Sequence, residues 1–241
     1  MSERAISITN LSYTYPDGTP GLRGISLDII RGESVGVIGP NGAGKTTLLL
    51  HLNGIFMSRN GNVEVLGKGM KKENIKGIRR SVGLVFQDPD DQLFMPTVFD
   101  DVAFGPINMG YAEAEVRESV TRALDGVGMT GYEQRSPHHL SIGEKKRIAI
   151  ATALAMNPEI LVIDEPTANL DPGSKWSLIG LLKRLPMTKI VASHDLELVQ
   201  ALCPRTIILD QGKVIVDGAT AHVLADIPLL VAHGLAPAKA D

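Results

Sequence analysis

The pattern of apolar and polar positions divides the chain into short strand-like runs separated by helix-like segments. Four of the runs are apolar through their centres, which is typical of strands buried on both faces of a parallel sheet. These runs are Ser34–Ile38, Val82–Phe86, Ile160–Ile163 and Lys189–Ser193. Because helix-like segments lie between them, we expect an α/β domain with a mostly parallel core sheet.

The N-terminal part of the chain has a different pattern. Residues Ala5–Tyr15 alternate in strand fashion, and turn signals separate them from strand-like residues at Leu22–Ile30. A further short strand is expected at Gly61–Gly67. These segments predict an antiparallel β layer that leads into the core sheet.

The pattern in the middle of the chain indicates an inserted, mainly helical subdomain. Residues 88–158 begin with an acidic, proline-containing stretch and become helix-like from residue 112 onward. Within them, Ser141 is placed as a helix N-cap and Glu144 stands three residues later, as in a capping box. We expect one domain over residues 1–241, with a helical subdomain inserted at 88–158 and a short helical tail at 219–241.

Composition narrows the functional classes. A formal net charge of −3 over 241 residues, with both signs interspersed, gives no broad basic surface for nucleic acid. The single cysteine, Cys203, allows no internal disulfide and favours a reducing compartment. Met1–Arg4 lead directly into a strand pattern, and no run approaches the ~20 apolar residues of a membrane span. Work at a membrane would therefore require docking on a partner.

The strongest single motif lies between the first apolar run and the helix-like segment that follows it. It matches GxxxxGK[ST] throughout, and its residues are Gly39, Pro40, Asn41, Gly42, Ala43, Gly44, Lys45, Thr46 and Thr47. In such a loop, backbone N–H groups point at phosphate oxygens and the helix N-terminus adds partial positive charge. Lys45 would reach the outer phosphates, and the Thr46 hydroxyl would bind Mg²⁺. The sequence therefore predicts a nucleoside triphosphate site.

Each of the other three apolar runs also delivers polar side chains at its carboxyl end. These side chains belong to Gln87, Asp164, Glu165 and His194. Ligands bind at that edge of a parallel sheet, so we expect them to converge on one nucleotide. Asp164 would hold Mg²⁺ through water, and Glu165 would be the general base for an attacking water. Gln87 and His194 would contact the water, the metal or the γ-phosphate.

One segment carries a family resemblance. Leu140–Glu144 resembles the LSGGQ signature of ATP-binding subunits of ABC transporters, with Ile142 in place of the first glycine and Glu144 in place of glutamine. The likeness extends over nearly the whole chain and implies an ATPase that uses ATP and Mg²⁺. It also implies that Ser141, Gly143 and Glu144 contact the nucleotide held by a partner subunit.

The same resemblance implies a mode of assembly. Ala168–Asp171 is similar to the segment that crosses the dimer interface, which makes Asn169 and Asp171 interface residues, and Tyr15 stands where an aromatic ring stacks on adenine. The implied assembly is a head-to-tail homodimer that closes on two ATP molecules and reopens after hydrolysis.

A finer resemblance is to energy-coupling-factor importers, especially the cobalt and nickel group. It rests on Val85–Phe94, Thr97–Pro106, Glu144–Arg147 and Leu229–Leu235. It implies a peripheral place on the cytoplasmic face of the membrane, bound to a transmembrane coupling protein and a substrate-binding membrane protein.

The acids Asp88, Asp90 and Asp91 are the candidates for docking that coupling protein, against the alternative of an ordinary solvated loop. Two other functions remain open. One is the same ATPase in a vitamin importer, and the other is an ABC ATPase that acts on DNA or the ribosome.

Overall fold

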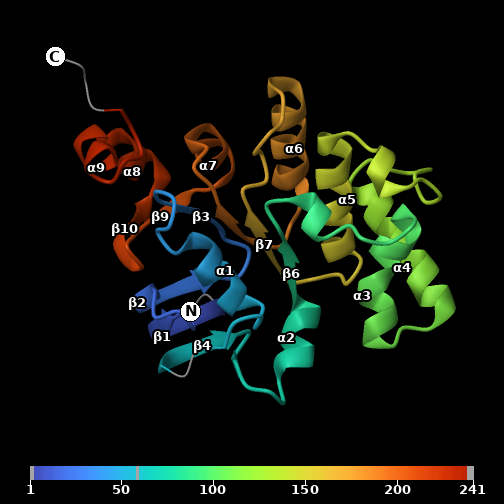
Figure 1. Ribbon diagram of the computed structural model, residues 1–241, viewed down its shortest axis with the longest axis horizontal. Coiled ribbons are helices and arrows are strands. Elements are labelled where there is room, and N and C mark those ends of the chain that lie inside the picture. The colour runs from blue at the N-terminus through green and yellow to red at the C-terminus, as the bar shows by residue number, and fades with distance from the viewer. Residues whose placement is uncertain (1–2, 58–59, 238–241) are drawn as a thin grey trace.

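The computed structural model describes residues 3–57 and 60–237, and its centre is a six-stranded sheet within those residues (Figure 1). The strand order is β10-β9-β3-β8-β7-β6, and every neighbouring pair is parallel except β10 with β9. The strands are β3 (Ser34–Ile38), β6 (Val82–Val85), β7 (Ile160–Asp164), β8 (Thr188–Ala192), β9 (Arg205–Asp210) and β10 (Lys213–Ala219). The four apolar runs are thus parallel neighbours, and their carboxyl ends share one edge.

A second, four-stranded antiparallel sheet is built from the N-terminal part of the described chain, in the order β2-β1-β4-β5. Its strands are β1 (Arg4–Thr14), β2 (Pro20–Ile30), β4 (Asn60–Val65) and β5 (Lys68–Gly69). Helix α1 (Lys45–Leu52) contacts strands of both sheets. The predicted antiparallel β layer is confirmed, and it encloses the helix that follows the phosphate loop.

Alternate residues of the central strands enter two hydrophobic cores. Val35, Val37 and Ile190 pack toward α1 and the antiparallel sheet, whereas Leu161 and Ile163 pack on the opposite side against helices. Because the two faces of a strand alternate, a run that is apolar at every position must be covered on both faces. This is why the sequence pattern alone identifies these strands.

The helices that follow β6 cover the other face and one end of the sheet, whereas α2 packs on the side of α1 through Ile78 (Figure 1). Helices α3, α4 and α5 pack on one another within the segment expected to be helical, and the short helices η1 and η2 flank them. The bounds are α2 (Ile75–Ser81), η1 (Pro89–Asp91), α3 (Val98–Met109), α4 (Glu113–Gly126), η2 (Pro137–His139), α5 (Ile142–Leu154), α6 (Pro172–Arg184), α7 (Leu196–Leu202), α8 (Thr220–Ala225) and α9 (Ile227–Ala232). Residues 1–2, which precede the first strand, and residues 238–241 of the expected tail lie outside the described residues.

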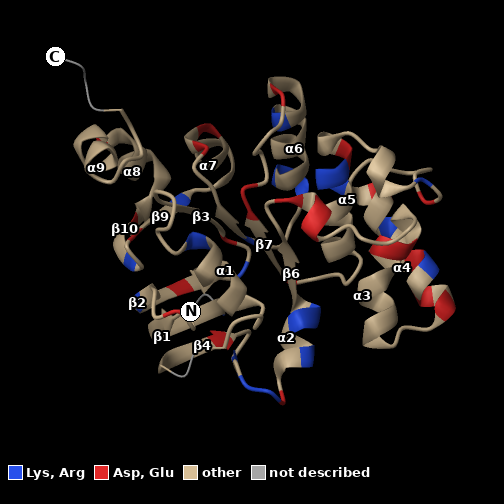
Figure 2. Ribbon diagram, viewed as in Figure 1, with Lys and Arg blue, Asp and Glu red and all other residues tan. Residues whose placement is uncertain are grey.

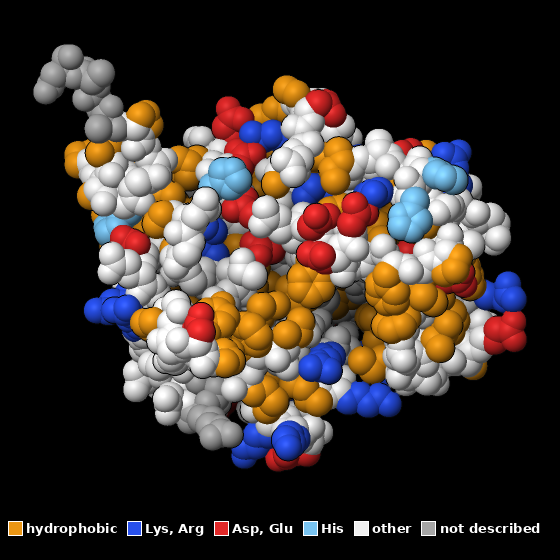
Figure 3. All heavy atoms as spheres, in the orientation of Figure 1, with side chains coloured by type: hydrophobic (Ala, Val, Ile, Leu, Met, Phe, Trp, Pro, Cys, Tyr) orange, Lys and Arg blue, Asp and Glu red, His pale blue; other side chains and the backbone are white. Residues whose placement is uncertain are grey.

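The surface has two notable features. Charges of both signs are interspersed, with acidic residues at η1 beside basic residues of α5 (Figure 2). Hydrophobic side chains gather on the viewed face over α3 and near the end of α1 (Figure 3). In the described part of the chain, no helix combines the length and the apolar character that a bilayer span requires.

Candidate nucleotide site

The phosphate loop joins β3 to α1 and leaves the N-terminus of that helix open. Gly44, the residue before α1, has φ of 102°, and no side chain caps the helix. A Cβ atom at Gly44 would lie 2.7 Å from the carbonyl oxygen of Gly21, so backbone geometry and crowding both require glycine there. Among the described residues, no side chain therefore caps the first N–H groups of α1, an arrangement that suits a bound anion.

Two side chains of α1 already hold the positions that phosphate chemistry needs. The Lys45 amino group donates to the carbonyl oxygens of Gly39 at 2.8 Å and Pro40 at 3.2 Å, which folds its side chain back over the loop. Thr46 donates its hydroxyl to Oδ2 of Asp164 at 2.6 Å. The loop is thereby joined directly to the end of β7.

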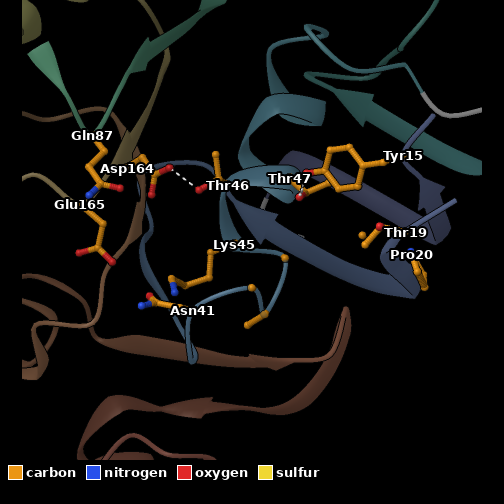
Figure 4. Close-up of a pocket in the computed structure, with 14 residues that line it drawn as sticks. Tyr15, Thr19, Pro20, Asn41, Lys45, Thr46, Thr47, Gln87, Asp164 and Glu165 are labelled. Carbon is orange, nitrogen blue, oxygen red and sulfur yellow. Dashed lines mark hydrogen bonds between the residues drawn. The ribbon is translucent and has the colours of Figure 1, made fainter. Parts of the chain in front are cut away.

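A cavity of about 320 Å³ opens above the loop (Figure 4). Tyr15 lies at one end of it, and Gln87, Asp164 and Glu165 lie at the other, from the ends of β6 and β7. Its full lining is Tyr15, Thr19, Pro20, Gly21, Asn41, Gly42, Ala43, Gly44, Lys45, Thr46, Thr47, Gln87, Asp164 and Glu165. The structure thus brings together most of the predicted nucleotide residues. It adds Thr19 and the first two residues of β2, Pro20 and Gly21, which the pairing of β2 with β1 places there.

Tyr15 is held by more than ring packing. Its hydroxyl and the Thr47 hydroxyl are 2.6 Å apart, and its ring meets those of Tyr13 and Phe56 edge to face. The adenine-stacking role expected for Tyr15 fits its place at the end of the cavity opposite the strand ends and stays a prediction.

The donor set of the site fits a Mg²⁺ ion. Asp164 is 5% exposed, and its Oδ1 atom is buried with no hydrogen-bond partner among the described residues, while Oδ2 accepts from Thr46. Burial raises the pKa of Asp164, and the Thr46 hydrogen bond opposes that shift. A cation would relieve both the orphaned oxygen and the desolvated carboxylate. No three His, Cys, Asp or Glu side chains cluster as a metal site in residues 3–57 and 60–237, as is usual where phosphates supply most ligands.

Glu165 is fixed by the end of β8. It has φ of 43°, a strained value for a non-glycine residue, and its side chain is buried. Ser193 donates its hydroxyl to Oε2 at 3.0 Å, the His194 backbone N–H donates to Oε1 at 3.1 Å, and His194 Nδ1 lies 2.9 Å from Oε2. His194 itself does not line the cavity, so it reaches the site through Glu165. Sequence reasoning missed Ser193, whose contact depends on the pairing of β7 with β8.

Lys146 is a second residue that the sequence did not single out. It lies on α5, is 5% exposed, and donates from Nζ to the carbonyl oxygens of Gln87 and Glu165, both at 3.1 Å. Burial lowers its pKa, while the charges of nearby acids act in the opposite direction.

The signature-like segment forms the start of α5 and lies outside this cavity, although Ile142 lines the adjoining cavity of about 430 Å³ with Gln87 and Asp164. The predicted capping box is confirmed: Ser141 Oγ accepts from the Glu144 N–H, and the Ser141 N–H donates to Glu144 Oε2 at 2.8 Å. Tyr132 donates its hydroxyl to the other carboxylate oxygen of Glu144 at 2.8 Å. Ser141 is exposed and Gly143 half-buried, but neither residue reaches the cavity of its own chain.

The expected interface residues follow β7 near this segment. Asn169 is exposed with φ of 64°, and Asp171 caps α6 by accepting from the Ser174 N–H at 3.0 Å. Ser174 is also one of the residues that a Cβ at Gly143 would meet. Both residues thus lie on the same side of the molecule as the signature-like segment.

The three docking candidates have different surroundings. Asp88 accepts from the Asp90 N–H at 2.9 Å, and Asp90 forms an ion pair with Lys145 at 2.7 Å. Asp91 lines a groove of about 340 Å³ that also includes Phe94 and Phe104, whose rings meet edge to face. Of the three acids, Asp91 alone combines an exposed position with this groove.

Comparison with known proteins agrees with this geometry. A family model of ABC transporters matches residues 22–168. The energy-coupling factor transporter ATP-binding protein EcfA of Methanothermobacter thermautotrophicus is 51% identical over 230 residues, which cover 93% of this chain and 74% of that protein. The solved structure of CbiO1 from Clostridium perfringens, described as part of the ABC transporter complex CbiONQ, has 38% identity and a TM-score of 0.83, covering 97% of this chain and 95% of its own.

A dimeric ATP-binding cassette bound to ADP and Pi has 28% identity and a TM-score of 0.80, covering 89% of this chain and 98% of its own. The loop, the cavity and the parallel sheet thus define an ATP-binding P-loop enzyme. The chain belongs to the ABC transporter family, as one of its ATP-hydrolysing subunits. The resemblance found in the sequence is confirmed at that level.

Proposed function

We propose that this chain powers an energy-coupling-factor importer as a homodimer that closes head to tail on two ATP molecules. The observation that carries the proposal is that the cavity above the phosphate loop lacks the two residues of the signature-like segment expected to contact phosphate. The cavity holds the phosphate loop and the strand ends, but it includes neither Ser141 nor Gly143. A second copy in the opposite orientation would bring its own α5 N-terminus over the open side of the cavity.

The residues of the cavity would divide the work of binding. Backbone N–H groups of the loop and the Lys45 amino group would hold the phosphates, and Thr46 and Asp164 would hold Mg²⁺, with Gln87 at the opposite wall. Bound Mg²⁺ would supply neutralisation of the charge that develops on the phosphate oxygens.

Glu165 is the proposed general base. Its carboxylate accepts hydrogen bonds from Ser193 and His194, which fix its direction while its own oxygens keep the capacity to accept a proton. The positive φ of Glu165 is the kind of backbone strain that persists where the surroundings fix a residue for function. His194 would orient Glu165 and contact the γ-phosphate only when the site closes.

The groove beside α3 is the proposed docking site for the membrane partner. Phe94 is 59% exposed and Phe104 is 45% exposed, an unusual exposure for large apolar side chains that pack on each other. A short helix from a transmembrane coupling protein would cover them, and Asp91 would face its basic residues. This docking would hold the chain at the cytoplasmic face of the membrane, with no contact to nucleic acid.

The proposed cargo is a cobalt or nickel ion, which a substrate-binding membrane protein would select. The proposal rests on the resemblance of the stretch after β6 and of the tail to that group. Metal uptake by cells that produce the complete transporter, measured with and without the intact ATPase, tests the cargo. If vitamin uptake, and not metal uptake, depends on the intact ATPase, the cargo is a vitamin. The proposed ATPase role would be unchanged by that result.

The ATPase site is tested by Glu165→Gln. This variant should bind Mg-ATP, remain dimeric with ATP and lose ATP turnover by at least ~100-fold, because the amide cannot accept the proton of the attacking water. Glu159→Gln is the matched control, since Glu159 immediately precedes β7 and forms an exposed ion pair with Arg31. Turnover in Glu165→Gln equal to that of Glu159→Gln would refute the general-base assignment.

Docking is tested by charge reversal. Asp91→Lys should impair assembly with the membrane partner and leave ATP affinity unchanged, whereas Asp125→Lys, on the exposed end of α4, should alter neither. If Asp91→Lys assembles with the membrane partner as well as the control does, Asp91 has no docking role and is an ordinary solvated residue.

A further inference from the structure

A buried lysine joins three parts of the molecule that the ATPase site depends on. Lys146 donates from Nζ to the carbonyl oxygens of Gln87 and Glu165, and it is carried by α5, whose first residues are the signature-like segment. Gln87 follows β6 and Glu165 follows β7, which are neighbouring parallel strands. One side chain thus connects both strand-end loops to the helical subdomain.

The surroundings of Lys146 make this connection costly to change. A buried amino group needs partners for its donors, and these two carbonyls are the partners that the structure provides. Asp88, Asp164 and Glu165 also lie near enough for their charges to act on it. Removal of the amino group would take this donor from the Gln87 carbonyl and leave the Glu165 carbonyl with the Ala168 N–H, in the two loops that carry Gln87 and Glu165.

A second buried lysine shows what a purely structural lysine of this kind looks like. Lys189, at the opposite end of the sheet on β8, is also 5% exposed and donates to two carbonyl oxygens, those of Leu185 at 2.7 Å and Met187 at 3.1 Å. Burial lowers the pKa of both lysines. The difference is their place: Lys189 ties a helix end to a strand start, far from the cavity edge.

We propose that Lys146 is a positioning residue, which holds the backbones at Gln87 and Glu165 of its own subunit in the geometry that hydrolysis needs. It does not line the cavity above the phosphate loop, and it lines the adjoining cavity of about 430 Å³ beside Gln87 and Asp164. The inference rests on the proposed roles of Gln87 and Glu165. A displacement of about 1 Å at such groups can cost on the order of 100-fold in rate, whereas phosphate binding through the loop would be little affected.

The first test compares Lys146→Met with Lys189→Met. We expect kcat for ATP to fall at least ~10-fold in Lys146→Met with KM changed less than ~2-fold, and both constants to stay near wild type in Lys189→Met. Thermal unfolding followed by circular dichroism compares their stabilities. If Lys146→Met does not fold, Lys146→Gln, whose amide can donate to one carbonyl, should fold and show a smaller loss of kcat. Equal kcat in the two methionine variants would overturn the proposal.

The second test identifies the subunit on which Lys146 acts. Lys146→Met is mixed either with Ser141→Arg, which blocks the signature segment, or with Glu165→Gln, which lacks the base. If Lys146 serves its own subunit, the mixture with Ser141→Arg contains one complete site. The Ser141→Arg subunit supplies strand ends supported by Lys146, and the Lys146→Met subunit supplies the unmodified signature segment. Activity should therefore return in that mixture and not in the other.

The opposite result would overturn the proposal. Activity that returns only with Glu165→Gln would mean that Lys146 serves the signature segment of α5 instead. The Glu165→Gln homodimer separates this failure from failure of the proposed function: if that homodimer turns over ATP at the wild-type rate, the general-base assignment fails whatever Lys146 does.

Discussion

The N-termini of α1 and α5 have the same physical capacity to bind an anion but opposite local arrangements. Helix α1 begins after Gly44 with no side-chain cap, and its first turn faces the cavity. Helix α5 begins after Ser141 with a complete capping box, and Tyr132 adds a further hydrogen bond to Glu144. One helix start thus lacks an acceptor, whereas the other supplies its own.

This difference indicates how the two ends are used. An uncapped N-terminus leaves backbone N–H groups free to bind an anion, so α1 can hold phosphate within a single subunit. A self-capped N-terminus is stable without ligand and keeps its shape while exposed. It would contribute to phosphate binding only when a second copy carries it to the nucleotide, which fits a site shared between two subunits.

The largest expected effect comes from closing the α1 N-terminus. Gly44→Ala would place a Cβ atom 2.7 Å from the Gly21 carbonyl oxygen at φ of 102°. Saturation with Mg-ATP to about 100 times Kd should stabilise the wild-type fold by about 2.7 kcal/mol, and this stabilisation should disappear in the variant. Thermal unfolding with and without Mg-ATP measures it.

The control for Gly44→Ala is Gly110→Ala. Gly110 caps the end of α3 with φ of 84° in open space, so alanine there has the same left-handed strain, ~1–2 kcal/mol, without contact to the cavity. It should keep the full stabilisation by Mg-ATP. If Gly44→Ala keeps it too, the open N-terminus of α1 does not hold the phosphates.

An intermediate effect is expected from removing the α5 cap. Ser141→Ala should lower the free energy of unfolding by about 1 kcal/mol. It should also reduce ATP turnover at least ~10-fold while stabilisation by Mg-ATP persists, because the phosphate loop is intact. Thr97→Ala is the matched control, since Thr97 caps α3 by accepting from the Asp100 N–H. Equal ATP turnover in the two variants would mean that Ser141 only caps α5 and has no role in hydrolysis.

The smallest effect concerns Glu144 and pH. The hydrogen bonds from the Ser141 N–H, the Tyr132 hydroxyl and the Ser141 hydroxyl hold the pKa of Glu144 below its ordinary value of 4.5. Because the folded state favours the ionised carboxylate, its stabilising contribution is present above pH 4.5 and is lost as pH falls through the lowered pKa. Glu144→Gln should therefore be less stable than wild type at pH 7, by a few tenths of a kcal/mol for a carboxylate at the surface, and this difference should shrink at pH 3.

Chemical denaturation at the two pH values measures this difference. A gap of the same size at both pH values would mean that the charge of Glu144 does not support the cap. Tyr132→Phe, which removes only one of the hydrogen bonds, should give a smaller gap with the same dependence on pH.

Local patterns made much of this site predictable. The phosphate loop, the four strand ends and the Ser141 cap each depend on a few consecutive residues, so the sequence contains them in full. The ranges of α3, α6 and α7 were not assigned from the sequence. Thr97, Asp171 and Asp195 do cap them, and Pro172 opens α6, but their apolar faces are set by packing on distant segments.

Contacts between distant segments could not be predicted. The bonds of Lys146 to the two strand-end loops, of Ser193 to Glu165 and of Tyr132 to Glu144 join residues up to 59 positions apart. The same holds for the pairing of Asp90 with Lys145 and for the place of Asp91 in the groove beside Phe94 and Phe104. Such contacts exist only after the sheet and the helical subdomain have packed together.

The central claim is that each ATP site needs the α5 N-terminus of a second copy, and mixing two inactive variants tests it most directly. Glu165→Gln lacks the base and Ser141→Arg lacks a usable signature segment, so each homodimer alone should be inactive. In a mixed dimer, one site combines the intact strand ends of the Ser141→Arg subunit with the intact α5 of the Glu165→Gln subunit. ATP turnover should therefore return on mixing and should rise with protein concentration. Full activity of Ser141→Arg alone, or no recovery in mixtures shown to contain the mixed dimer, would contradict the claim.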